Sequence, residues 1–343
     1  MVTRRELTAL FECFPYLRIA VVGDLFLDKW LTIDPTLNEP SVETGLAAWQ
    51  VVDIHAAAGA AGTVLNNLSA LGVGMLYAIS LIGMDGEGFE IKRALIEKRV
   101  DLSMLVESDK VRTPAYIKPL ILQADGTRAE QNRMDHKNRK QTPKEIENVL
   151  ISGMEQAAEK VDAIILLDQL AEENTGVVTQ AVRKAAARLA NKHPNLIIYA
   201  DSRAFIGKFE NMIIKCNNHE AAALSGMAAE AVFSTEEVFK ALAVLSKQTA
   251  RPVFVTCNEY GVAINFEGKP ALVAAAKQTE EIDICGAGDA CTAGIVSALC
   301  AKADVKTAAL LGNLCAGVTV RKLGVTGDAT RQEVLALYDE QFS

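Results

Sequence analysis

The stretch DICGAGDAC, residues 283–291, combines two glycines with two carboxylates. The polar run ending near Ile284 predicts a strand, and the apolar segment 290–301 predicts a buried helix. The first turn of a helix has unpaired N–H groups and the positive end of a dipole, so it holds anions such as phosphate. Asp289 lies in this turn, placed to accept a proton from a hydroxyl that attacks phosphorus. The spacing therefore indicates phosphoryl transfer.

Two other interpretations of this stretch stay open. Gly286 and Gly288 also fit the start of the dinucleotide-binding pattern GxGxxG. That interpretation is disfavoured because Cys291 occupies the third glycine position and the stretch does not open an N-terminal βαβ unit. The alternative without chemistry is a glycine-rich turn capped by Asp289.

Composition narrows the class of protein and its partners. A chain of 343 residues suits one large α/β domain or two smaller ones. A net charge of −8 argues against nucleic-acid and anionic-membrane partners, which leaves a small soluble substrate. The seven cysteines show no CxxC spacing, which indicates reduced thiols in the cytoplasm and no zinc site. No apolar run suits a signal peptide or approaches the roughly 20 residues of a membrane helix.

Apolar runs that end in an acidic residue recur along the chain. Residues 17–24, 163–168 and 196–201 end in Asp24, Asp168 and Asp201, and 75–82 is a similar apolar run. Such runs, separated by helical segments, predict a doubly wound, mostly parallel sheet with the acids at its ligand-binding edge. Asp28 follows Asp24 closely, so both are expected either to contact hydroxyls of a polyol or to be solvated loop acids.

Outside these strands, residues 31–54 predict short strands, and 113–122 pairs with a short strand before residue 132. Residues 62–71 and 306–323 predict helices, the second broken only by Asn313, which needs an internal or a ligand hydrogen bond. Asn217 and Glu220 have the spacing of a helix capping box. They serve either as a cap or at a phosphate with hydrated Mg²⁺.

These motifs together resemble the ribokinase-like (PfkB) family of carbohydrate kinases over nearly the whole chain. The resemblance rests on Gly23-Asp24, the Ala/Gly-rich helix start at Gly59, Asn217-x-x-Glu220, residues 283–289 and Asn313. Gly23-Asp24-x-x-x-Asp28, Asn132-Arg133-x-Asp135 and Lys322-x-Gly324 look most like the kinase half of bacterial heptose-phosphate kinase/adenylyltransferases. The resemblance implies one kinase domain over residues 1–343, with helices on both faces of the sheet. It also implies a small β-sheet lid, formed by about 31–54 and 113–131, through which a homodimer is expected to form.

The resemblance also implies roles for individual residues. Asp289 is expected to be the catalytic base, and the anion hole is formed by Gly286, Ala287 and Gly288. ATP and Mg²⁺ are expected at Asn217, Glu220, Thr256, Asn258, Gly261 and Asn313. The sugar or sugar phosphate is expected at Asp24, Asp28, Gly59, Thr63, Lys118, Arg133 and Asp168. A K⁺ site is expected at Asp283 and the main chain near Cys285, Lys322 and Gly324.

Three departures from the family pattern keep other functions open. Thr63 stands where the family has a sugar-contacting Asn, Asn258 replaces a loop glycine, and Gln169 begins a segment unlike that of heptose kinases. The first two suggest a catalytically impaired sugar- or nucleotide-binding protein as the alternative, although Asn tolerates the positive φ of such a loop. A nucleoside kinase would need base-stacking aromatics, for which Trp30 and Trp49 are the only tryptophans.

The acceptor itself is predicted from basic residues. If two of Lys118, Arg133 and Arg203 converge, they offer the donors that a phosphate monoester needs, whereas isolated side chains would be solvated surface charges. We therefore expect a phosphorylated sugar to be preferred over a free one.

Overall fold

A ten-stranded sheet forms the centre of the computed structural model, which describes residues 2–226 and 234–342. In sheet order its strands are β17 (Lys269–Val273), β16 (Val262–Phe266), β15 (Val253–Thr256), β14 (Ile213–Asn217), β13 (Ile197–Ser202), β12 (Ala163–Asp168), β1 (Arg18–Gly23), β6 (Met75–Gly83) and β7 (Val100–Asp101), with β8 (Leu105–Ser108) also paired to β6. Only β16 and β17 run antiparallel to their neighbours. The predicted mostly parallel sheet is confirmed.

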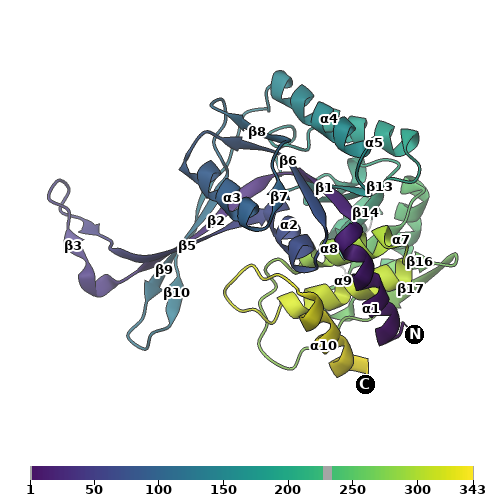
Figure 1. Cartoon of the computed structure of the whole chain (residues 1–343). Helices are drawn as coiled ribbons and strands as arrows, with labels where there is room; N and C mark the ends of the chain where they lie inside the picture. Colours follow the sequence, from purple (N-terminus) through teal and green to yellow (C-terminus); the bar gives the residue numbers. More distant parts are fainter. Residues whose placement is uncertain (1, 227–233, 343) are drawn as a thin grey trace.

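Helices cover both faces of this sheet (Figure 1). One layer contains α1 (Arg4–Cys13), α2 (Ala61–Ala70), α3 (Gly86–Glu97), α8 (Ala287–Cys300), α9 (Val305–Thr319) and α10 (Arg331–Phe342). The other contains α4 (Lys144–Ala158), α5 (Gln180–Lys192), α6 (Asn218–Leu224) and α7 (Thr235–Thr249).

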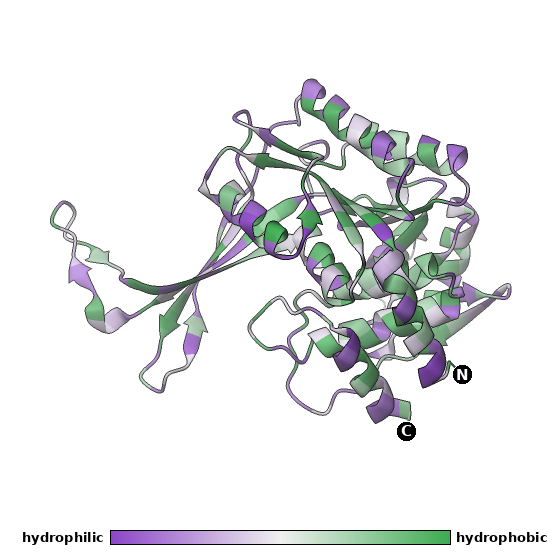
Figure 2. Ribbon diagram, in the orientation of Figure 1, coloured by the Kyte–Doolittle hydropathy of each residue, from purple (hydrophilic) through white to green (hydrophobic). Residues whose placement is uncertain are grey.

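The apolar strand residues alternate between these two layers. Ile19 and Val21 of β1 pack in the first core, whereas Ala20 and Val22 pack in the second. Both faces of the strand are therefore buried, which explains its continuous apolar run. Figure 2 shows the strands at the centre of the molecule as predominantly hydrophobic.

A second sheet projects from the body as an arm (Figure 1). Its strands are β10 (Arg128–Glu130), β9 (Ala115–Leu122), β2 (Leu25–Ile33) and β5 (Val51–Ala60), with β11 (Met134–His136) on β9. Two short strands, β3 (Glu39–Pro40) and β4 (Ala47–Ala48), pair with each other between β2 and β5. The predicted pairing of 113–122 with the strand that follows is confirmed as β9 with β10.

Two sequence expectations about the last third of the chain are wrong, and one predicted helix starts three residues earlier than expected. No strand precedes the glycine-rich stretch, because the main chain at Asp283 bonds to Val320 at the end of α9 rather than to a sheet neighbour. Helix α8 begins at Ala287, since Gly286 supplies the left-handed turn that starts it. Helix α9 ends at Thr319, and a further helix, α10, follows it. The sequence pattern did not predict α10 because this helix contains many polar residues. Across the described residues, no helix is long and apolar enough to cross a membrane.

Candidate active site

The carboxyl ends of the parallel strands meet at one edge of the central sheet. Asp24 follows β1, Asp168 ends β12, and Asn217 ends β14. Asp168 is paired in register with Ser202 of β13, and Asn217 with Thr256 of β15. Open α/β sheets bind their ligands at this edge, so most of the predicted polar residues lie at one candidate site.

Helix α8 presents its N-terminus at this site. Gly286 caps the helix with a φ of 79°, a conformation that costs glycine little. The Thr63 methyl lies 3.4 Å from where a Cβ of Gly286 would stand, so α2 packs directly on this turn. The N–H of Ala287 bonds within the turn, whereas those of Gly288 and Asp289 have no acceptor in the part of the chain that the structure describes. The turn therefore offers two free donors.

The carboxyl group of Asp289 lies beside these donors and is half-buried. Burial raises its pKa to about 7, and the neighbouring charge of Asp201 adds to the rise. Lys215 and Arg203 act in the opposite direction. The group is therefore set to exchange a proton near neutral pH.

Lys215 is a site residue that our sequence interpretation missed. Its side chain is buried in β14, with Nζ 2.6 Å from Oδ2 of Asp201 and 3.5 Å from where a Cβ of Gly288 would stand. Burial disfavours the ammonium charge, but Asp201 and other nearby groups outweigh it, so the pKa of Lys215 lies above its ordinary value. A lysine inside the apolar run 213–217 was the available signal, because a buried charge requires a partner.

Asp283 links the loop that precedes α8 to the segment that follows α9. Its Oδ1 accepts from the N–H of Cys285 at 2.9 Å, and its Oδ2 accepts from the N–H of Gly324 at 3.1 Å. The Lys322 ammonium lies 2.8 Å from Oε1 of Glu333. Asp283 thus links the main chain at Cys285 and Gly324. The K⁺ site expected there, with the Lys322 main chain as a further part, stays a prediction.

The predicted nucleotide residues lie along the hairpin of β15 and β16 and on α9. Asn258 has a φ of 50° and so adopts the positive φ expected of it. Gly261 has a φ of 109°, and a Cβ there would stand 2.0 Å from the Val273 carbonyl oxygen. Asn313 donates to that same oxygen at 2.7 Å, so its amide has an internal partner. The Thr256 hydroxyl donates to a main-chain carbonyl of β14 at 3.3 Å.

Asn217 and Glu220 form a closed capping box at the start of α6. The Glu220 N–H donates to Oδ1 of Asn217, and the Asn217 N–H donates to Oε2 of Glu220, both at 2.8 Å. Desolvation raises the pKa of Glu220. The cap uses one carboxylate oxygen, which leaves Oε1 of Glu220 outside it.

Two buried acids stand together at the ends of β1 and β12. The Asp24 carboxylate accepts from the N–H groups of Val177 and Gln169, at 2.7 and 3.1 Å. Asp168 accepts from the Ser202 hydroxyl at 2.8 Å. Burial raises the pKa of Asp168 to about 7, with a further contribution from Asp24. Asp24 is thus tied to the main chain that follows β12 and is not a solvated loop acid.

Asp28 lies on the arm rather than beside Asp24. Lys118 of β9 places Nζ 3.2 Å from Oδ1 of Asp28 and 4.4 Å from the centre of the Trp30 ring. A Cβ on Gly59 would stand 2.1 Å from Oδ2 of Asp28, so Gly59 leaves the space for this carboxylate. Trp30 is only 8% exposed, and its ring also faces that of His55.

Of the other two predicted basic residues, only Arg133 lies near Asp28. Arg133 bonds both carboxylate oxygens of Asp135 and stacks 4.1 Å above the ring of Tyr116, which is the register partner of Asp28. Asp135 raises the pKa of Arg133 most, and the charge of Asp28 also contributes. Arg203 acts instead on Asp289, from beyond β13. Lys118 and Arg133 thus converge on one face of the arm, while Arg203 lies at the sheet edge.

Comparisons with known proteins show the family of this chain. The model of the pfkB family carbohydrate kinases matches residues 30–331. The bifunctional protein HldE of Citrifermentans bemidjiense is 29% identical over 289 residues, which are 83% of this chain and 56% of that protein. The chain thus spans little more than half the length of this relative. The resemblance drawn from the motifs is confirmed.

Solved structures share the fold at lower identity. Ribokinase of Arabidopsis thaliana, complexed with ribose and ATP, has a TM-score of 0.68 and 19% identity, covering 95% of this chain and 99% of that one. A tetrameric inhibited form of phosphofructokinase-2 from Escherichia coli has a TM-score of 0.70 and 15% identity, covering 95% and 100%. At these identities the likeness shows the ribokinase-like fold alone.

Proposed function

The chain belongs to the pfkB family of carbohydrate kinases, and we propose that it transfers the γ-phosphate of ATP to a hydroxyl of a phosphorylated sugar. The observation that carries the proposal is the start of α8, where a carboxyl with a pKa of about 7 stands beside two free main-chain donors. A base whose pKa is near the working pH is effective in proton transfer. Free donors at a helix N-terminus favour the charge of a transferring phosphoryl group.

The proposed reaction is one direct displacement. The acceptor hydroxyl oxygen attacks the γ-phosphorus while Asp289 takes the hydroxyl proton, and the bond to ADP breaks on the opposite side. The N–H groups of Gly288 and Asp289 stabilise the charge on the phosphoryl oxygens. Lys215, behind this turn, adds a positive charge. No phosphoenzyme forms.

ATP is proposed to bind along the β15–β16 hairpin and α9, with its phosphates directed at α8. Glu220 keeps Oε1 outside its cap and is placed to hold a hydrated Mg²⁺, which supplies neutralising charge to the phosphates. No cluster of three metal-ligating side chains occurs among the described residues.

The acceptor is proposed to lie between the arm and the sheet edge. Arg133 and Lys137 share one acid, Asp135, and both approach the Tyr116 ring, so a positive charge is left over beside Asp28. That surplus suits a phosphate monoester, while the carboxylates suit hydroxyl groups. Of the two tryptophans that a nucleoside kinase could use to stack on a base, Trp30 is buried, whereas Trp49 is 54% exposed and keeps that alternative open. Asn258 accommodates its loop, so an impaired binding protein is now suggested by Thr63 alone.

The test is Asp289→Asn, assayed by ADP release with a panel of free and phosphorylated sugars. We expect kcat to fall by roughly 10² to 10⁴, with little change in ATP affinity, because the variant loses only the proton acceptor. Asp304→Asn is the matched control, since Asp304 caps α9 near the opposite end of α8. Turnover close to that of the unmutated protein would remove Asp289 from the proposed role.

The arm is proposed to be the lid of a single kinase domain and the contact surface for a second copy of the chain. Val42, Leu46, Trp49 and Ile54 are exposed by 54% or more. Val42 and Leu46 lie between β3 and β4, and Figure 1 shows β3 at the end of the arm furthest from the body. A clustered apolar surface favours burial by association. Light scattering should give twice the chain mass, and Trp49→Ser should lower it, whereas Val149→Ser on α4 should not.

We place the protein in the cytoplasm. All seven cysteines are free thiols. Burial raises the pKa of most of them, for example that of Cys291 to about 11, so these thiols stay protonated and unreactive.

A further inference from the structure

A cavity that is open to solvent lies beside α5, in the helix layer opposite that of α8. It has a volume of about 620 Å³ and lies between one face of α5 and the segment containing the short helix η3 (Ile206–Lys208). Its lining residues are Gln180, Arg183, Lys184, Ala187, Arg188, Asn191, Gly207, Lys208, Glu210 and Asn211. The volume is within the range of small-molecule sites. We call it the α5 cavity.

The α5 cavity carries an excess of positive charge. Four basic side chains line it, against the single acid Glu210, in a chain whose net charge is −8. Lys184 and Arg188 have no ion-pair partner in the portion of the chain that is described. Lys208 forms an ion pair at 2.9 Å with Glu173, which is not one of the residues that line the cavity. Cations gathered without matching acids attract an anion.

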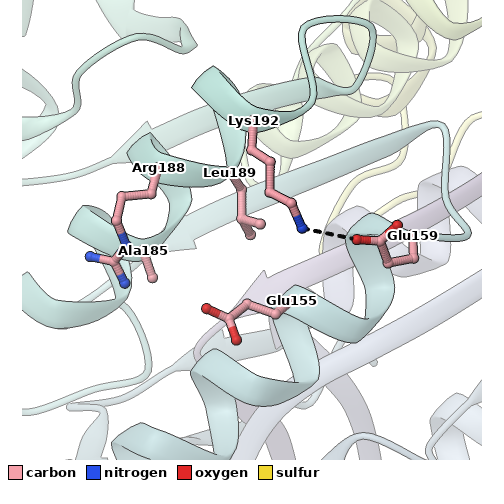
Figure 3. Close-up of a pocket in the computed structure, with 6 residues that line it drawn as sticks. All are labelled: Glu155, Glu159, Ala185, Arg188, Leu189 and Lys192. Atoms are coloured by element: carbon pink, nitrogen blue, oxygen red, sulfur yellow. Dashed lines mark hydrogen bonds and ion pairs between the residues drawn. The ribbon is translucent and has the colours of Figure 1, made fainter.

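The groove on the other side of α5 shows that this excess is local. Figure 3 shows that groove, where Glu155 and Glu159 of α4 face the basic residues of α5. Lys192 lies there with Nζ 3.2 Å from Oε1 of Glu159. The groove has two acids and two bases, Arg188 and Lys192, so an anion has no advantage there. Arg188 borders both the groove and the α5 cavity, whereas Lys184 borders the α5 cavity alone.

Arg183 connects the α5 cavity to the sheet edge. Its side chain is 4% exposed, and one guanidinium nitrogen donates to Glu173 at 2.7 Å. The other terminal nitrogen donates to the Val178 carbonyl at 3.1 Å and lies 3.9 Å from Oδ2 of Asp168. A charge bound in the cavity therefore acts on a guanidinium that also faces Asp168 at the proposed sugar end.

We propose that the α5 cavity binds a phosphate-bearing small molecule and that Arg183 transmits its binding to Asp168; this second step rests on the function proposed above. The bound dianion faces Lys184, which has no ion-pair partner among the described residues, and Arg188, which lies between the cavity and the groove. The carboxamides of Gln180, Asn191 and Asn211 are available to hydroxyl groups of the same molecule. The negative charge of the bound anion partly offsets the positive charge that Arg183 presents to Asp168. The interaction of the Asp168 carboxyl with the sugar therefore changes.

Calorimetric titration with pyrophosphate tests the binding step, with Arg133→Ala in every protein titrated so that the proposed acceptor site adds no class. The otherwise unmutated protein should show two classes of site, one at α8 and one in the α5 cavity. Lys184→Glu and Arg188→Glu should each lose the second class, with affinity at least about tenfold lower, as expected for a lost charge-assisted contact. Lys192→Glu makes the same charge change on the same helix, in the groove of Figure 3, and should keep both classes.

The outcomes separate this proposal from the proposed function. If α8 does not hold phosphate, the unmutated protein shows one class and Lys184→Glu shows none. If Lys184→Glu titrates like the unmutated protein, the α5 cavity is not an anion site. At saturating ATP, pyrophosphate should change KM for the sugar by a different factor in the unmutated and Lys192→Glu proteins than in Lys184→Glu, where only competition at the acceptor site remains. Equal changes in all three, with binding intact, would overturn the step through Arg183.

Discussion

Lys215 and Asp201 form an ion pair with a separation of 2.6 Å directly behind the turn that carries Asp289. The two partners act on the pKa of Asp289 in opposite directions, because the carboxylate raises it and the ammonium lowers it. Substitution of either partner should therefore change the pKa of Asp289 while Asp289 itself stays unmutated.

The first prediction concerns the pH dependence of kcat. The pKa of Asp289 is raised to about 7, so it is protonated and inactive below that value, and kcat should fall as pH falls through about 7. Asp201→Asn should move this fall to lower pH, and Lys215→Met should move it to higher pH and also lower kcat. Asp201→Asn/Lys215→Met, which removes both charges, should lie between the two. Shifts in the same direction in both single variants would contradict the arrangement.

The second prediction concerns the acceptor. Arg133→Ala should raise KM for a sugar phosphate far more than for the unphosphorylated analogue, since only the first presents a dianion. Arg128→Ala is the matched control. Arg128 lies on β10 of the same arm and forms its ion pair with Asp53, at 3.8 Å, rather than with Asp135. Equal changes in KM for the two substrates, or efficient turnover of a free sugar by the unmutated protein, would exclude a phosphate contact at Arg133.

A third prediction follows from the link that Asp283 makes between Cys285 and Gly324. If a monovalent cation stiffens this link, activity should be higher in K⁺ than in an equal concentration of tetramethylammonium. Asp283→Ala should lower the activity and remove the difference between the salts. Identical rates of the unmutated protein in the two salts would mean that the Asp283 hydrogen bonds alone hold the loop.

The fourth prediction concerns Gly261, which has a positive φ and faces the Val273 carbonyl oxygen. Gly261→Ala should lower the free energy of unfolding by at least about 2 kcal/mol and raise KM for ATP, because it adds a clash to backbone strain. Gly268→Ala is the control, since Gly268 also has a positive φ but open space around it. Its cost should be about 1 kcal/mol, with KM unchanged. Equal losses of unfolding free energy in the two variants, measured by chemical denaturation, would show that the structure adjusts to relieve the clash at residue 261.

Local patterns in the sequence determined the elements that carry the site. Continuous apolar runs ending in an acid predicted β1, β12 and β13 and placed Asp24 and Asp168 at one edge of the sheet. The glycines before Asp289 predicted a helix N-terminus, and the tolerance of Asn for positive φ predicted the loop at Asn258. These features depend on neighbours along the chain, so short-range backbone and burial preferences suffice to predict them.

Only the tertiary structure decided which side chains pair. Lys322 bonds to Glu333 rather than to the loop of Asp283, Asn313 bonds to the end of β17, and Lys215 meets Asp201 across two adjacent strands. For each of these side chains, several residues far away in the sequence have the chemistry of a suitable partner. Local sequence patterns therefore do not identify which one is the actual partner. Packing brings one partner within hydrogen-bonding distance and removes water, and the cost of an unpaired buried charge then enforces the pair.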